Sequence, residues 1–333
     1  MQKTLDRKIN TLVTAGKEIG KKIFGRKDPM KPLKKVEHID EASIHIPSAD
    51  VSHIRRRWLD VSYANLSPAQ NLDIYLPDEG EGPFAVILYI HGGGFAIGDK
   101  RDIHVLAWLR GLEHRYAVVS VNYRLSGDGI FPAGLQDIKA AIRWSRANSE
   151  RYNLDGNRIA ACGGSSGGNL AAMICLTDHV TEFDDFRLGN LEFPCNVQAA
   201  VDWFGPTDFL KMDEQLEESG FGPSDHGEAY SPESRYLGAK LSDALLKVEL
   251  ANPMTYIHAN MPPILIQHGR LDTLVPVQQS IMFVEKLEKY VNRDRFEFDI
   301  LEGAGHGDPL FETEENMARV FSFLDQHLKK SLR

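Results

Sequence analysis

Short apolar runs recur along most of the chain, and some of them are apolar at nearly every position. Phe84–Ile90 and Ala117–Tyr123 are of this kind, which is typical of strands covered on both faces of a sheet. Two earlier runs alternate between apolar and polar residues, as strands with one covered face do. The pattern predicts strands at Trp58–Tyr63, Leu72–Leu76, Phe84–Ile90, Ala117–Tyr123, Ile159–Cys162, Val197–Phe204, Ile264–His268 and Phe296–Leu301.

Apolar residues at helical spacing lie between these runs. They predict helices at Leu135–Arg151, Ser165–Leu176, Val277–Val291 and Glu314–Leu328, the first with Ile138, Ala141, Ile142 and Trp144 facing inward. Strands that alternate with helices indicate an α/β fold, with a mostly parallel sheet and helices on both faces. The alternation breaks at about 207–253, which is polar and contains glycine. We expect a cap-like insertion there, after the sixth strand and over the carboxyl edge of the sheet, where ligands bind.

The first 24 residues carry a different pattern. Leu5, Ile9, Leu12 and Ile19 recur at helical spacing, with basic residues on the other face. Residues 1–35 hold eleven Lys and Arg against three Asp and Glu. We therefore expect an N-terminal amphipathic helical arm or cap with a linker at 1–50, and the main domain at 51–333. A cap that packs on the protein itself is favoured for residues 1–24, and contact with an anionic membrane surface is the alternative.

Composition narrows the class of protein and its partners. The chain has 333 residues, is 42% hydrophobic and 26% charged, and has a net charge of −9, so nucleic acid is not an expected partner. The start lacks the apolar core of a signal peptide, and the three cysteines show no C-x-x-C spacing, which favours a cytoplasmic protein with reduced thiols. No metal is predicted, because metal-ligand spacing is absent from the histidines His38, His45, His53, His104, His226 and His258.

The main candidate for a catalytic motif is Arg158–Met173. This segment begins as a strand-like run, passes through a glycine-rich turn and continues as a helix-like run. This is the context of the G-x-S-x-G nucleophile elbow, a strained turn that exposes a serine hydroxyl. Two registers fit, with Gly163 and Gly167 around Ser165 or the next pair of glycines around Ser166. A plain strand-to-helix turn explains the motif by itself equally well.

Two further residues follow predicted strands in the order that this architecture requires. Asp272 comes just after Ile264–His268, and His306 lies in a glycine-rich loop after the last strand. A serine needs a base, and the base needs an orienting acid, so serine, aspartate and histidine in this order indicate a catalytic triad. Either residue alone is better explained as a turn or cap residue. Asp208 is the second candidate for the acid, although a capping role is the more ordinary interpretation of it.

His91-Gly92-Gly93-Gly94 follows the central strand Phe84–Ile90. Lipases and esterases place backbone N–H donors there to bind the oxyanion of acyl transfer. We assign donors to Gly93, Gly94 and the residue after the nucleophile. A phosphate-binding loop is the competing interpretation, but the G-x-G-x-x-G and Gly-Lys-Ser/Thr patterns are missing.

In combination, these motifs resemble carboxylesterases of the α/β-hydrolase fold, namely the hormone-sensitive-lipase-like branch and the bacterial feruloyl and acetyl-xylan esterase-like branch. The resemblance spans about residues 55–330 and rests on HGGGF, NYRL with FPA, GGSSGGNLAA, VDWFGPTDF, HGRLDTLVP and GAGHGD. It implies an eight-stranded, mostly parallel sheet and a reaction without a cofactor. It further implies Ser165 as nucleophile, His306 as base, Asp272 as orienting acid, and Gly93, Gly94 and Ser166 as the oxyanion hole.

The expected function is that of a serine hydrolase acting on a small-molecule carboxylic ester, with short-chain acyl, acetyl or feruloyl groups favoured by the resemblance. A peptidase or amidase of the same fold and a non-catalytic ligand-binding relative remain as alternatives. Two departures from the family bear on which acyl group is preferred. Gly164 stands where many relatives carry Asp or Glu, and Phe95 stands where the feruloyl-esterase-like branch often has Trp. Phe95, Trp203 and Phe204 are candidates to line the substrate pocket, and core packing explains them equally well.

Overall fold

The computed structural model describes residues 46–221 and 224–329. The predicted arm of residues 1–24, with its proposed cap or membrane role, lies outside these ranges, as does most of the linker. None of the helices in the two described ranges is long and apolar enough to cross a bilayer. The cytoplasmic location stays a prediction.

One eight-stranded sheet forms the centre of the described chain, and its order is β1-β2-β4-β3-β5-β6-β7-β8. The strands are β1 (Arg57–Ser62), β2 (Asn71–Tyr75), β3 (Phe84–Ile90), β4 (Ala117–Val121), β5 (Leu154–Gly164), β6 (Ala199–Trp203), β7 (Ile264–Gly269) and β8 (Phe296–Leu301). The β1–β2 and β2–β4 pairs are antiparallel and all other pairs are parallel. All eight predicted strands are therefore confirmed, together with the mostly parallel sheet.

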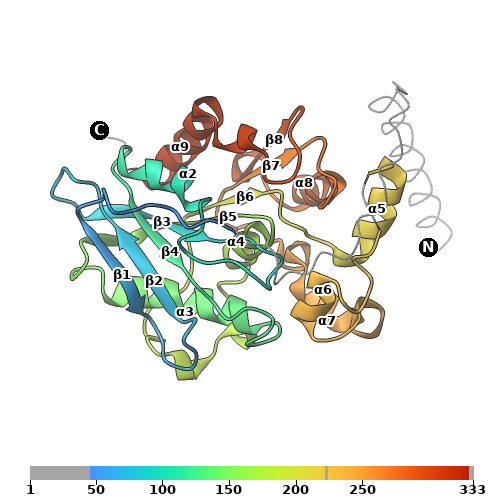
Figure 1. Cartoon of the computed structure of the whole chain (residues 1–333), viewed down its shortest axis with the longest axis horizontal. Coiled ribbons are helices and arrows are strands. Elements are labelled where there is room, and N and C mark those ends of the chain that lie inside the picture. The colour runs from blue at the N-terminus through green and yellow to red at the C-terminus, as the bar shows by residue number, and fades with distance from the viewer. Residues whose placement is uncertain (1–45, 222–223, 330–333) are drawn as a thin grey trace. The chain divides into compact units, whose positions relative to one another are not determined.

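Helices cover both faces of this sheet, as predicted (Figure 1). On one face α3 (Ala133–Ala147) and α4 (Ser166–Leu176) pack against Val86, Leu88 and Ile90 of β3, and α8 (Gln278–Tyr290) packs against β7 on the same side. On the other face α2 (Val105–Leu109) and α9 (Glu314–Leu328) cover the alternate residues Ala85, Ile87 and Tyr89. This division follows from the two-residue repeat of a strand, which sends successive side chains to opposite faces.

Some element boundaries differ from the prediction. Strand β5 begins at Leu154, before the predicted Ile159, because the polar stretch Asp155–Arg158 continues the strand at its partly exposed beginning. Helix α3 ends at Ala147 rather than Arg151. Its Trp144 is half-buried and packs against the core, as predicted. Arg146 is also buried, and it donates hydrogen bonds to three backbone carbonyls, those of Gly156, Pro194 and Asn196.

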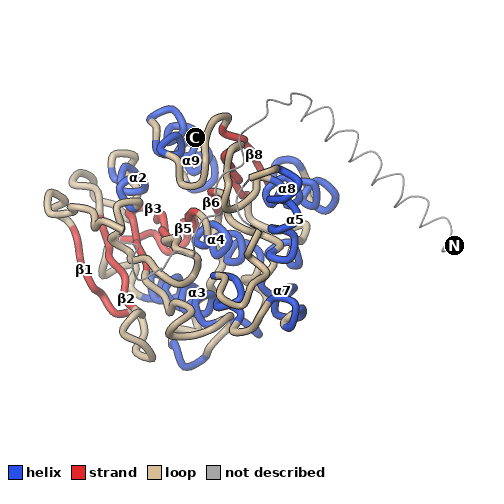
Figure 2. The backbone as a smooth tube through the Cα atoms, turned by 45° about the vertical axis from the view of Figure 1, so that its right-hand side comes forward, coloured by secondary structure: helices blue, strands red, loops and turns tan. Residues whose placement is uncertain are grey.

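The predicted insertion at 207–253 consists of short helices in the structure. They are α5 (Met212–Ser219), α6 (Pro232–Leu237) and α7 (Leu245–Ala251), with 3₁₀ turns at Phe209–Lys211 and Leu241–Asp243. Figure 2 shows α5 beside α8, at the end of the sheet opposite β1. Two side-chain hydrogen bonds join these helices, Gln279 to Gln215 at 2.7 Å and Gln278 to Ser219 at 2.6 Å. The cap role of this segment stays a prediction.

A buried ion pair fixes the chain after β4 to helix α3. Asp137 is fully buried, and its two carboxylate oxygens accept hydrogen bonds from the Arg124 side chain at 2.7 and 2.8 Å. The same carboxylate also accepts the Arg124 backbone N–H and the Gln70 side-chain amide. A bidentate pair of this kind depends on both partners, because a single charge left in the interior is costly.

We expect Asp137→Ala to lower the free energy of unfolding by about 3–5 kcal/mol, because it leaves the mostly buried Arg124 guanidinium unpaired. Urea denaturation measures this change. The matched control is Glu228→Ala, which breaks a solvent-exposed pair with Lys240 and should cost less than about 1 kcal/mol. Equal losses in the two variants would contradict the account.

Candidate active site

Ser165 occupies the sharp turn between β5 and α4. Its backbone has φ 58° and ψ −127°, a conformation that residues with a side chain rarely adopt, and its N–H donates to Trp203 O at 2.9 Å. The following turn passes very close to β3, since a Cβ atom on Gly167 would lie 2.2 Å from Ile90 O. Only glycine fits at that position, which accounts for the glycine-rich sequence around the serine.

The three predicted triad residues lie together. His306 Nε2 is 3.0 Å from Ser165 Oγ, and His306 Nδ1 is 2.7 Å from Asp272 Oδ2. With the proton on Nδ1, the imidazole donates to Asp272 and accepts from the serine hydroxyl. Ser166, the alternative nucleophile, has its side chain buried in the first turn of α4. The geometry of the site therefore fits the Ser165 register.

Asp272 is held as a carboxylate by its surroundings. Its Oδ1 accepts the N–H groups of Leu274 and Val275 at 2.9 and 2.8 Å. Burial by itself raises the pKa of Asp272, but the charge of His306 and hydrogen bonds from His268 and His306 outweigh it and hold the pKa well below its usual range. Asp208, the second candidate for the acid, instead caps a 3₁₀ turn by accepting Leu210 N–H.

Sequence reasoning missed His268, which supports Asp272 from the end of β7. It is fully buried, and its Nε2–H donates to Val275 O at 2.8 Å and lies 3.4 Å from Asp272 Oδ2. Its Nδ1 accepts from Ser280 Oγ at 2.7 Å. His268 had been assigned only to a buried strand, and its polarity at a strand end was the available signal.

The glycine loop lies beside the serine. A Cβ atom on Gly92 would be 3.5 Å from Ser165 Cβ, and one on Gly93 would be 2.2 Å from Ile97 O, so the loop closes tightly on itself. Gly93 and Gly94 both have positive φ, at 108° and 59°. The buried ring of His91 contacts the loop backbone, with its Nδ1 2.8 Å from Gly92 O. Burial lowers the pKa of His91, so the ring is neutral.

Among the three predicted pocket residues, Phe204 packs its side chain against the triad, whereas Trp203 contacts Ser165 through its backbone carbonyl. The Phe204 ring centroid lies 4.7 Å from that of His306 in an edge-on arrangement, and a Cβ atom on Gly164 would be 3.0 Å from the Phe204 ring. Gly164 therefore leaves space for this ring. Phe95 and Trp203 are buried in the core, where Phe95 stacks on Tyr236 at 3.9 Å, and direct contact between these two and a substrate stays a prediction.

The helical insertion contacts the loop of Asp272 through His226, which also forms a buried ion pair within the insertion. His226 Nδ1 lies 3.2 Å from a carboxylate oxygen of Glu233 on α6, and both side chains are 6% exposed. The other ring nitrogen, Nε2, donates to Leu274 O at 3.0 Å, two residues from Asp272. Burial lowers the pKa of His226, but Glu233 and nearby acidic groups outweigh it and raise the pKa to about 9. Sequence reasoning had given His226 no role.

Comparison with known proteins relates the chain to esterases. The family model BD-FAE matches residues 72–287. LipM of Mycobacterium tuberculosis, described as a probable carboxylic ester hydrolase, is 30% identical to this chain. The match covers 79% of this chain and 61% of LipM. Esterase LipC of the same organism is 28% identical, over 74% of this chain and 58% of LipC. The chain thus spans about three fifths of the length of these curated relatives.

Solved structures give the same picture. A truncated carbohydrate esterase from gut microbiota is 29% identical with a TM-score of 0.74, over 85% of this chain and 100% of that one. The bifunctional GH43-CE protein of Bacteroides eggerthii is 34% identical with a TM-score of 0.72, over 82% and 38%. Together with the sheet order, these similarities confirm the predicted α/β-hydrolase fold.

The raised pKa of His226 implies that the stability of the fold depends on pH. Because the folded-state pKa is raised from 6.5 to about 9, the stabilisation is complete below about pH 6.5 and is lost as the pH rises through about 9. We expect the urea midpoint to fall between pH 7 and 10 in the wild type and in His53→Gln, which alters an exposed histidine, but to fall less in His226→Gln. The same slope in all three proteins would contradict this assignment.

Proposed function

The chain belongs to the BD-FAE family of α/β-hydrolase esterases, and from this premise we propose that it is a serine hydrolase that cleaves carboxylic esters. The observation that carries the proposal is the continuous hydrogen-bonded chain from Ser165 through His306 to Asp272. A hydroxyl is a weak nucleophile unless a base of this kind removes its proton.

The proposed reaction has two halves. Ser165 Oγ attacks the ester carbonyl while its proton passes to His306 Nε2, and the tetrahedral intermediate expels the alcohol, which takes that proton. A water molecule then gives a proton to His306 and attacks the acyl carbon, which releases the acid and returns the proton to Ser165. Asp272 stabilises the positive imidazole through Nδ1, and the deeply lowered pKa keeps it ionised throughout. Every step uses groups of this chain.

The oxyanion hole is proposed to consist of the N–H groups of Gly93, Gly94 and Ser166. Support comes from the closeness of the glycine loop to Ser165 and from the positive φ of Gly93 and Gly94, which turn the loop back on itself. Ser166 begins α4, so its N–H is free of the helix's own hydrogen bonds. Fixed donors beside the attacking oxygen stabilise the charge that develops there.

The proposed substrates are small esters with short acyl groups, among them acetyl or feruloyl esters of carbohydrates. Two of the relatives in the comparison carry carbohydrate esterase or CE in their descriptions. The ring of Phe204 provides an apolar neighbour to His306 and is supported from the core by Phe311, 4.6 Å away. A peptidase or amidase finds no specific support, and the intact Ser165–His306 contact disfavours a purely ligand-binding protein.

We expect Ser165→Ala to reduce kcat for p-nitrophenyl acetate and butyrate by at least about 10⁴-fold, because it removes the nucleophile. Ser166→Ala keeps the backbone N–H and should lose far less. Steady-state hydrolysis of both esters measures the difference. Retained activity in Ser165→Ala, or a greater loss in Ser166→Ala, would count against the assignment.

The two acid candidates give a second comparison. Asp272→Asn should lower kcat by about 10⁴-fold, since an amide no longer stabilises the imidazolium or its tautomer. Asp208→Asn, which changes only a capping carboxylate, should stay within about tenfold of the wild type. The same ester assay applies, and the reverse order of effects would identify Asp208 as the acid.

A further inference from the structure

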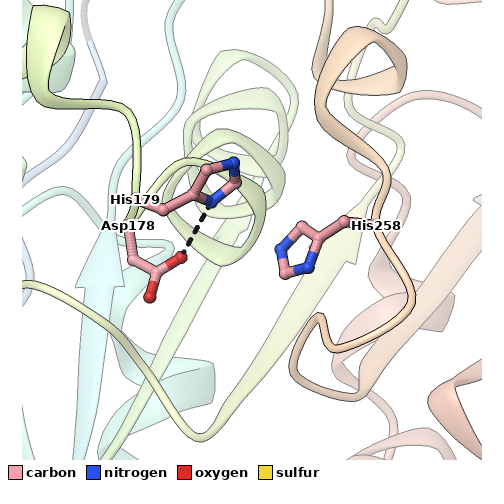
Figure 3. Close-up of side chains that lie close together, drawn as sticks. All are labelled: Asp178, His179 and His258. Atoms are coloured by element: carbon pink, nitrogen blue, oxygen red, sulfur yellow. Dashed lines mark hydrogen bonds and ion pairs between the residues drawn. The ribbon is translucent and has the colours of Figure 1, made fainter.

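Three side chains with metal-binding chemistry lie together outside the site described above. They are Asp178 and His179, in the loop after α4, and His258, in the loop between the 3₁₀ turn Pro253–Tyr256 and β7. Their ligand atoms lie within 4.8 Å of one another. Figure 3 shows the His258 ring facing the Asp178–His179 pair across a short gap. The sequence predicted no metal site because these two loops are far apart along the chain.

Both loops are held in place by contacts outside the cluster. Val180 N–H donates to Thr177 O, and Met261 N–H donates to His258 O, each at 3.1 Å, so each loop is a hydrogen-bonded turn. The rings of Phe183 and Tyr256 meet edge to face at 5.7 Å and join the two loops. The three side chains are therefore brought together by the fold itself.

One buried nitrogen of the cluster lacks a hydrogen-bond partner among the described residues. His258 Nε2 is buried, and within the described part of the chain it has no hydrogen-bond partner. Buried polar atoms nearly always have a partner, and an imidazole nitrogen is the commonest metal ligand in proteins. Two imidazoles and one carboxylate match the ligands that Zn²⁺ prefers. We propose that Asp178, His179 and His258 bind a divalent transition-metal ion of the Zn²⁺ class, which cross-links the loop after α4 to the loop before β7.

The geometry suits such an ion after a small adjustment. Ligand atoms about 2.0–2.1 Å from a tetrahedral Zn²⁺ lie roughly 3.3 Å apart. Asp178 Oδ1 and His179 Nδ1 are already 3.3 Å apart. His179 is exposed, so rotation of its side chain closes the remaining distance to His258. On binding, the His179 proton moves from Nδ1 to the other ring nitrogen, and water fills the fourth position.

Charge at the cluster also favours a cation. The negative charge comes from the Asp178 carboxylate, whose Oδ1 lies 3.3 Å from His179 Nδ1. The cluster is remote from the ester chemistry, since Ser165 precedes α4 and Asp178 follows it. Eleven helical residues separate the two ends by about 16 Å. The ion is therefore structural and takes no part in the proposed reaction.

The test is calorimetric titration of Zn²⁺ into the full, tag-free chain after treatment with EDTA and removal of the chelator. The expected result is saturable binding of about one Zn²⁺ per chain. It should weaken by at least about tenfold in His258→Ala and in His179→Ala, and remain in His53→Ala, which removes an exposed histidine outside the cluster. Saturating Zn²⁺ should raise the thermal midpoint of the wild type and of His53→Ala only.

His179 is exposed, so its replacement does not threaten folding, and the test does not rest on His258→Ala alone. The proposal is overturned if the wild type shows no saturable binding. It is equally overturned if His179→Ala and His258→Ala bind Zn²⁺ as tightly as the wild type does. Ester hydrolysis is not used as a readout, so the result is independent of the proposed function.

Discussion

Parallel pairing from β5 through β8 is the constraint on which the candidate active site depends. Gly164 at the end of β5 pairs with Trp203 of β6, Trp203 pairs with Gln267 of β7, and Gly269 pairs with Leu301 of β8. The strands therefore end nearly level, and the loops that follow them meet at one edge of the sheet. A serine, an aspartate and a histidine spread over 141 positions come within hydrogen-bond distance for this reason. A change of register in any of these pairs would separate them.

The surroundings of each ionisable group at this edge of the sheet decide whether it is charged or neutral. Asp272 stays charged although it is buried, because two backbone N–H groups and two histidines surround it. His91 stays neutral in the glycine loop, because burial lowers its pKa more than the nearby Asp102 and Asp99 raise it. A hydrogen bond from His226 Nε2 to Leu274 O joins the helical insertion to the loop that carries Asp272, and Glu233 within the insertion pairs with the other ring nitrogen of His226. The insertion thus contacts Leu274, whose N–H donates to Asp272.

Much of this could be predicted from the sequence, because the central strands are uninterrupted apolar runs and the site residues follow them directly. The glycines around Ser165 were also informative, since their spacing reflects backbone contacts that exclude a Cβ atom. The features that could not be predicted from the sequence depend on tertiary contacts or on elements too short to show a pattern. Helix α2 has only five residues, too few for a periodic pattern, and buried Arg146 gains its partners from distant loops. The Asp178, His179 and His258 cluster is visible only after two loops meet.

The central claim is that Ser165 is the nucleophile activated by His306. Labelling with a fluorophosphonate, followed by mass spectrometry of the digested protein, tests it most directly because the reagent reacts much faster with an activated serine than with an ordinary hydroxyl. The account predicts one adduct per chain, on Ser165, with labelling slowed strongly when His306 is replaced by Gln. An adduct on Ser166, or labelling of Ser165 that proceeds as fast without the histidine, would contradict it.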